Sequence, residues 1–97
     1  LHTEGPKAIA VVVDRKGSTP VKTGAIMCVN ALGQSFGTIG GGCGEHEVLR
    51  KALEVLSDKK DMFLSVDMTN DFAGEEGMVC GGTMDVIIRY VPGKVEI

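Results

Sequence analysis

The sequence has no tryptophan, one tyrosine, three phenylalanines and three prolines in 97 residues. A chain of this length forms one domain and buries about 60 to 65% of the surface that the unfolded chain exposes. It cannot enclose a deep cleft between two domains of its own, so a large site would be shared with a partner or a second copy. No apolar run approaches the roughly 18 residues of a membrane span, and we expect no membrane insertion.

Positive charge is also scarce, because ten Lys and Arg stand against 13 Asp and Glu, for a formal net charge of −3. A surface that binds the nucleic-acid backbone needs clustered basic residues. The nearest approach is two short pairs, at 15–16 and 59–60, which we interpret as solvated turn residues. The charge pattern argues against a nucleic-acid partner.

The three cysteines, Cys28, Cys43 and Cys80, cannot form an even set of disulfides. This number favours a reducing compartment, and we expect a cytoplasmic protein. Cys43 and His46 have the two-residue gap of metal sites, and Cys80 could join them. Because a closed zinc site usually needs four ligands, we predict no metal site.

Glycine is the residue in excess, with 14 in the chain, about twice the average share. The glycines gather at 24–44 and 74–82, between apolar segments. This placement is typical of loops that bring the backbone close to a neighbour or a ligand.

The apolar pattern predicts an α/β (α+β) fold, a mixed sheet of about five strands with one main amphipathic helix packed on it. The β-branched run Lys7–Val13 predicts a strand buried on both faces. Apolar residues at three- and four-residue spacing predict the helix over Glu45–Leu56. The remaining strands are expected at 24–29, 34–39, 62–66 and 83–91. The first two of these, 24–29 and 34–39, should be neighbours in an antiparallel hairpin.

Between the last two predicted strands, residues 67–77 are polar and acidic. We expect a short helical turn here through Glu76, capped by Thr69 or Asn70. The carboxylates of the segment could serve acid/base chemistry or a divalent metal, but such a run is more typical of a solvated loop.

Residues 37–45, Gly-Thr-Ile-Gly-Gly-Gly-Cys-Gly-Glu, leave a predicted strand and enter the predicted helix. Free backbone N–H groups and the helix dipole favour a phosphate or another anion there, and the alternative is a tight turn without a ligand. The segment lacks the P-loop lysine and the third glycine of a dinucleotide fingerprint, so nucleotide triphosphate hydrolysis is not expected. Glu45 suits the helix dipole or could accept a hydrogen bond from a ligand amine. The candidate binding residues are Gly40, Gly41, Gly42, Cys43 and Glu45.

A second glycine-flanked cysteine lies in residues 77–82, Gly-Met-Val-Cys-Gly-Gly. Backbone donors there could favour the thiolate of Cys80 and make it a nucleophile or a holder of sulfur or a soft metal. Cys43 is open to the same interpretation, and the alternative for both is a small buried hydrophobe. Cys80 is our candidate catalytic residue, with Gly81 and Gly82 beside it at the site.

The segment Gly17-Ser-Thr-Pro20 links the first two predicted strands and is followed by Lys22. Hydroxyls and a proline are usual in a turn. If this segment meets the glycine-rich one across the sheet, Ser18 and Thr19 supply hydroxyls and Lys22 a cation for a bound phosphate.

Taken in order, three segments resemble the signature of the XdhC/CoxI family. They are Gly17–Pro20 with Gly24–Met27, Gly37–Gly42 with Glu45, and Gly77–Gly82, and together they cover nearly the whole chain. The resemblance implies an accessory protein for molybdenum hydroxylases such as xanthine dehydrogenase. Such a protein would bind the molybdenum cofactor (molybdopterin), protect its sulfurated form and help deliver it to the apo-enzyme.

The resemblance implies the apo-hydroxylase and a cysteine desulfurase as partners, and we expect a homo-oligomer and a chaperone rather than an enzyme. Many members have a basic residue directly after the proline, where this chain has Val21 and then Lys22. Many also continue into a C-terminal dinucleotide-type domain, and we interpret 1–97 as a single domain without it. Two alternatives stay open: an enzyme that transfers sulfur through Cys80 or Cys43, and an interaction module whose glycine loops only turn the chain.

Overall fold

The computed structural model describes residues 5–17, 19, 21–39, 44–68, 71–73 and 78–93, with the backbone alone considered for 71–73 and 78–80. It contains one helix, seven strands and two sheets within those residues. The elements are β1 (Lys7–Lys16), β2 (Ile26–Asn30), β3 (Ser35–Gly37), α1 (Glu45–Asp58), β4 (Met62–Asp67), β5 (Asp71–Ala73), β6 (Met78–Cys80) and β7 (Thr83–Val91).

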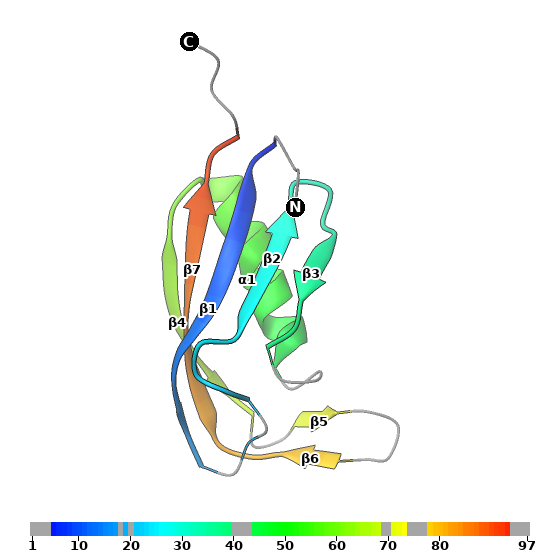
Figure 1. The fold of residues 1–97 in the computed structure, drawn as a ribbon, viewed down its shortest axis with the longest axis vertical. Coiled ribbons are helices and arrows are strands. Elements are labelled where there is room, and N and C mark those ends of the chain that lie inside the picture. Colours follow the sequence, from blue (N-terminus) through cyan, green and yellow to red (C-terminus); the bar gives the residue numbers. More distant parts are fainter. Residues whose placement is uncertain are drawn as a thin grey trace.

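The main sheet has five strands in the order β3-β2-β1-β7-β4, and α1 packs on one of its faces (Figure 1). The predicted fold class, five strands with one helix on the sheet, is confirmed. The expected mixture of parallel and antiparallel pairs is wrong, because every described pair is antiparallel. Hairpin connections join β1 to β2 and β2 to β3, and a short connection of this kind makes antiparallel neighbours.

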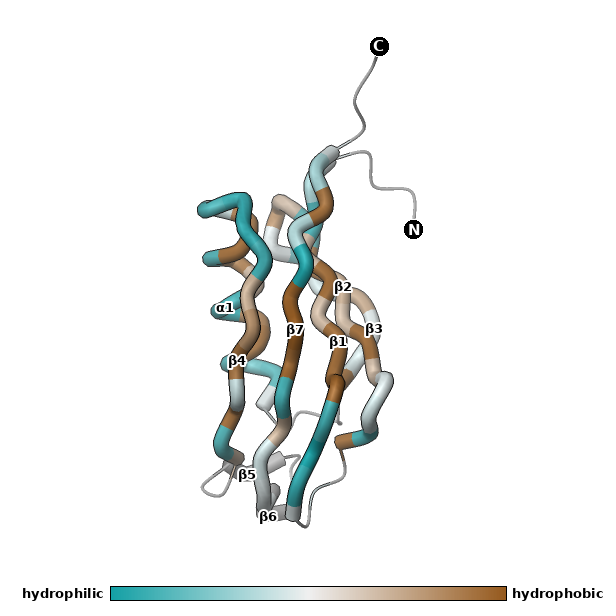
Figure 2. The backbone as a smooth tube through the Cα atoms, turned by 90° about the vertical axis from the view of Figure 1, so that its left-hand side faces the viewer, coloured by the Kyte–Doolittle hydropathy of each residue, from teal (hydrophilic) through white to brown (hydrophobic). Residues whose placement is uncertain are grey.

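The core lies between α1 and the face of the sheet that α1 covers. Alternate residues of each strand point to this face, and the helix contributes a stripe at three- and four-residue spacing. Figure 2 shows the two layers from the side, with α1 on one side of the sheet. The fully buried core residues include Ala8, Ala10, Val12, Val29, Val48, Ala52, Val55, Val86 and Ile88.

The strand predicted over Lys7–Val13 exists, but the prediction that both its faces are buried is wrong. Ala8, Ala10 and Val12 are buried, whereas Ile9 and Val11 on the opposite face are only half-buried. No described element covers that second face. The run of β-branched residues is typical of a doubly covered strand, and the described residues leave its second apolar face open.

The helical turn predicted within residues 67–77 is wrong where the structure describes them. β5 pairs with β6 in a separate two-stranded sheet, with Phe72 opposite Val79. The proposed caps, Thr69 and Asn70, lie outside the described residues.

A β-bulge divides β1 into two parts. The pairing with β7 shifts between Val12 and Asp14, so one extra residue, Val13, stands in β1. The bulge changes which residues share a face, because side chains alternate along a strand. At one end of this pair Lys7 is opposite Val91, and at the other Lys16 is opposite Thr83.

Candidate functional site

The backbones of two glycines lie against each other at one end of the β1–β7 pair. Gly17 directly follows the end of β1, and Gly82 directly precedes the start of β7. Gly17 and Gly82 both have positive φ, 86° and 83°. A Cβ atom on Gly82 would lie 2.1 Å from the carbonyl oxygen of Lys16, and one on Gly17 would lie 2.8 Å from the Cα of Gly82. Only residues without a side chain allow the two backbones to approach this closely.

The start of β7 is tied to the end of β4 and to the helix at the same place. The Met68 N–H donates to the carbonyl oxygen of Gly82 at 2.9 Å. Met68 and Met84 are fully buried, and a Cβ on Gly44 would lie 2.5 Å from Cε of Met84 and 3.2 Å from Sδ of Met68. Four segments far apart in the sequence therefore meet at one end of the sheet, and we call Gly17, Gly44, Gly82, Met68 and Met84 the glycine junction.

Helix α1 begins at the glycine junction. Its N-cap is Gly44, with φ 72° and no side-chain cap hydrogen bond. Glu45 is the first helical residue, and its carboxylate accepts hydrogen bonds from the Ile39 N–H at 2.9 Å and from the Thr38 hydroxyl. The carboxylate thus ties Thr38 and Ile39 to the start of α1, and its charge suits the positive end of the helix dipole.

The segment between β1 and β2 folds back on β1. Gly24 donates to the Val12 carbonyl at 2.7 Å, and the Val12 N–H donates to Ala25 at 3.0 Å. The Thr19 hydroxyl accepts a hydrogen bond from the N–H of the fully buried Val21 at 3.2 Å. The Lys22 side chain is exposed. Thr19 therefore shapes the turn, and Lys22 presents its charge to solvent.

The remaining predicted site residues divide into two groups. Cys80 ends β6 and is followed by Gly81 and Gly82, so its backbone leads directly into the glycine junction. Ser18, Gly40, Gly41, Gly42 and Cys43 lie outside the described residues.

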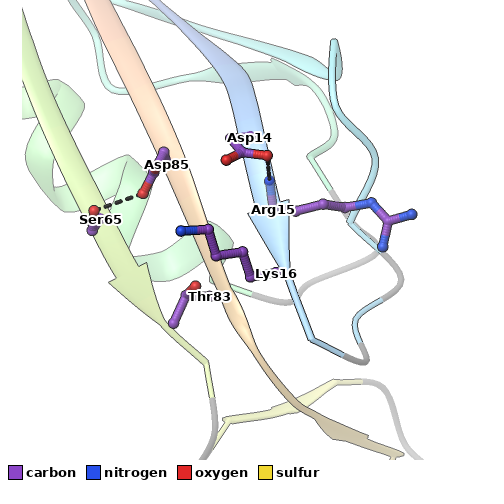
Figure 3. A pocket seen from close by; sticks show the side chains of 6 residues that line it. All are labelled: Asp14, Arg15, Lys16, Ser65, Thr83 and Asp85. Carbon is purple, nitrogen blue, oxygen red and sulfur yellow. Dashed lines mark hydrogen bonds between the residues drawn. The ribbon is translucent and has the colours of Figure 1, made fainter.

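Sequence reasoning missed a pocket beside the glycine junction, of about 310 Å³ (Figure 3). Asp14, Asp85 and Ser65 are opposite one another on β1, β7 and β4, and the Ser65 hydroxyl donates to Asp85 at 2.6 Å. In Figure 3 the Lys16 ammonium lies on the Asp85 side, while the Arg15 guanidinium points away. The alignment of the two aspartates depends on the bulge, which no signal in the sequence marks.

Among the described residues, no group of three or more His, Cys, Asp or Glu side chains could hold a metal ion. No helix in the described part of the chain is long and apolar enough to cross a membrane.

The sequence profile of the XdhC and CoxI family matches residues 1–67. The chain belongs to this family. The matched range includes the first two of the three motif segments, Gly17–Pro20 with Gly24–Met27 and Gly37–Gly42 with Glu45, and the third lies beyond it.

Two further proteins are similar to this XdhC/CoxI chain. The uncharacterized protein YqeB of Escherichia coli K12 is 41% identical over 83 residues, which are 86% of this chain and 15% of that protein. The crystal structure of a xanthine dehydrogenase (BH1974) from Bacillus halodurans superposes with a TM-score of 0.76 and 28% identity, over 93% of this chain and 27% of that one. The chain thus spans between about a seventh and about a quarter of the length of these two proteins.

Proposed function

We propose that this XdhC/CoxI protein is an accessory factor that binds the molybdenum cofactor and helps its sulfuration and insertion into a molybdenum hydroxylase of the xanthine dehydrogenase type. It would act in the cytoplasm, as a homo-oligomer, with the apo-hydroxylase and a cysteine desulfurase as partners. The observation that carries the proposal is the glycine junction, where Gly17 lies against Gly82, and Gly82 is bonded to Met68, which packs beside the N-cap Gly44 of α1.

The residues at the junction suit the phosphate of molybdopterin. No side chain caps the first turn of α1 at Gly44, so an anion could bind the N-terminal N–H groups of the helix. Gly40, Gly41, Gly42 and Cys43 would form the wall of the site, with Ser18, Thr19 and Lys22 supplying hydroxyls and a cation. When bound, the cofactor supplies the molybdenum and sulfur chemistry, and this chain would hold and orient it without turnover of its own.

The carboxylate of Glu45 has a positioning role in this proposal. It is bonded to Thr38 and Ile39, so it holds these two residues at the start of the helix. Removing the negative charge while keeping the shape weakens these bonds, because a charged acceptor makes stronger hydrogen bonds than a neutral one.

Cofactor binding is tested by calorimetric titration of the purified chain with molybdopterin, and by oxidation of bound pterin to its fluorescent derivative. We expect a dissociation constant of about 10 μM or lower, and Glu45→Gln should raise it about tenfold. The control is Glu47→Gln, also in the first turn of α1 but paired with Arg50 at 2.6 Å. No binding at about 100 μM molybdopterin, or equal affinities of the two variants, would contradict the proposal.

A second candidate function is sulfur transfer through Cys80. It is favoured by the position of Cys80 at the end of β6, two residues before Gly82. In this case the Cys80 thiolate would react with iodoacetamide at neutral pH faster than free cysteine, and Cys80→Ser would abolish the fast phase. A rate equal to that of free cysteine removes this candidate.

A further inference from the structure

The face of the sheet opposite α1, which we call the open face, carries a continuous row of apolar side chains. Val11 is opposite Ile26 on β2 and Ile87 on β7, and Ile87 is opposite Phe63 on β4. These four residues cross four neighbouring strands, and we call them the apolar row. Phe63 is 63% exposed and Ile26 54% exposed, and Phe36 on β3 extends the apolar surface at 39%.

An apolar open face departs from the usual pattern of a two-layer fold. An antiparallel sheet with one covered face normally alternates apolar residues inward with polar residues outward. Here Ile9 and Val11 stand on the outward side of β1, and Figure 2 shows the apolar middle of β1, β2 and β7. Contiguous exposed apolar surface of this kind marks an interaction site.

Charges flank the apolar row differently on its two sides. On the side toward Val91, Arg89 follows Ile87 on the open face and forms an ion pair with Asp61 at 2.9 Å. On the side toward the glycine junction, Asp14 and Asp85 are cross-strand partners. Within the described residues neither aspartate forms an ion pair. The row is thus flanked toward Val91 by the Arg89–Asp61 pair, and toward the glycine junction by two adjacent carboxylates with the Lys16 ammonium on the Asp85 side.

We propose that a second copy of this chain covers the open face, related by a two-fold axis that runs along the apolar row. This rotation reverses the strand direction, so it lays one apolar row on the other and Arg89 over the partner's Asp85, twice per dimer. An axis along the strands would instead place Asp14 and Asp85 over the same two aspartates of the partner subunit, where like charges repel. The placement of the two aspartates therefore favours the first arrangement.

The size of the face sets the strength of the dimer. Five strands about 4.8 Å apart and about five residues of each strand make roughly 400 Å² of flat area per copy. Stable dimers bury about 800 Å² per partner, and smaller interfaces are weak and transient. The dimer should therefore form at tens to hundreds of micromolar, with the two sheets about 10 Å apart.

This inference rests on the proposed function in that it concerns how the homo-oligomer forms. Because its test uses no cofactor, the result for the dimer is independent of whether the chain binds molybdopterin. Sedimentation velocity of the full chain from about 5 to 500 μM should show a shift from one chain to two. Phe63→Ser should raise the dissociation constant at least about tenfold. Because Phe63 is exposed, the variant should keep its urea midpoint, and Ile26→Thr serves as a second variant of the same row.

The matched controls are Leu32→Ser and Leu53→Ser, which remove exposed leucines from the β2–β3 turn and from α1, 83% and 43% exposed. Both should leave the dissociation constant unchanged. Arg89→Glu and Asp85→Arg should each weaken the dimer, and the double variant should recover at least part of the loss. A monomer at every concentration, as expected if another protein occupies the open face, would overturn the proposal. So would a dimer equally sensitive to Phe63→Ser and Leu32→Ser, or a double variant no better than either single one.

Discussion

Gly82 shows what a single missing side chain does in this protein. Its carbonyl accepts the Met68 N–H, and its Cα lies against Gly17, so it holds β4, β7 and the end of β1 together. Gly24 has a similar backbone conformation, with φ 93° against 83°, but a Cβ there would meet nothing within 4 Å. Comparing the same substitution at the two glycines therefore separates the free-energy cost of a positive φ from the cost of a steric overlap.

We expect Gly24→Ala to lower the free energy of unfolding by about 1 to 2 kcal/mol, the cost of a positive φ for a residue with a side chain. Gly82→Ala should lose at least about 2 kcal/mol more, because its methyl group would overlap the Lys16 carbonyl. Urea denaturation followed by circular dichroism measures both. Equal losses of unfolding free energy in the two variants would show that the backbones at the glycine junction can move apart at no cost in stability.

Helix α1 contributes to the stability of the fold mainly through the side that faces the sheet, and little through the side that faces solvent. Val48, Ala52 and Val55 are fully buried against the sheet, whereas Leu53 is 43% exposed. On the solvent side Arg50 donates to Glu47, and this bond holds the pKa of the Glu47 carboxyl below its usual value. The exposed pair contributes little compared with the buried stripe, because solvent screens it.

Val55→Ala should therefore lower the free energy of unfolding by about 2 kcal/mol, from two lost methyl groups and the cavity they leave. Leu53→Ala removes more atoms but should cost less than about 1 kcal/mol, because much of that side chain already contacts water. Chemical denaturation of both variants gives the comparison. A larger loss for Leu53→Ala would mean that α1 faces the sheet differently.

A separate prediction for α1 concerns pH. A carboxyl with a lowered pKa in the folded state stabilises the fold above its unfolded pKa, and this contribution is lost as the pH falls through the folded value. Glu47→Gln should thus have a slightly smaller drop in urea midpoint between neutral pH and about pH 3 than the unaltered chain. An equal or larger drop in the variant would show that the Arg50 pair contributes nothing.

The sequence predicted elements best where one periodicity dominates. The strand Thr83–Val91 has the predicted bounds, and the helix starts at the predicted Glu45 and ends two residues later than expected, at Asp58. β5 was missed, because its three residues, Asp71–Ala73, are too few for a period and stand among acidic residues. The partner strand β6, which ends at Cys80, was missed because it too has only three residues.

The segments that form the candidate site could be predicted from the sequence, but which of their residues lie next to each other could not. The glycine segments are visible in the sequence, because glycine is in excess and gathers between apolar segments. That Gly17 crosses Gly82, and that Asp14 stands opposite Asp85, follows from strand register and from the bulge after Val12. Register depends on tertiary pairing, which local sequence does not encode.

At the scale of the whole molecule, the strand order makes the sheet uneven in stability. β1 and β7 have a neighbour on each side, whereas β3 and β4 are edges, and all three residues of β3 are exposed. Segments with few buried contacts open locally, while central strands open only when the domain unfolds.

Native-state hydrogen exchange should therefore be slowest at Ala8–Val12 and Val86–Ile88. It should be faster in β3, at Ser35–Gly37, by at least about a hundredfold. The measurement is exchange followed by nuclear magnetic resonance at neutral pH. Comparable protection in β3 and β1 would show that something outside the described residues covers the β3 edge.

The pairing of Lys7 with Val91 has a practical consequence for experiments on this chain. The outer ends of the first and last strands are neighbours, and the glycine junction begins at the opposite end, beyond Lys16 and Thr83. The ten residues of β1 span about 30 Å. A protein immobilised on a sensor chip through a linker at Lys7 or Val91 would thus be anchored far from the junction, which would face the flowing analyte whichever of the two positions was chosen.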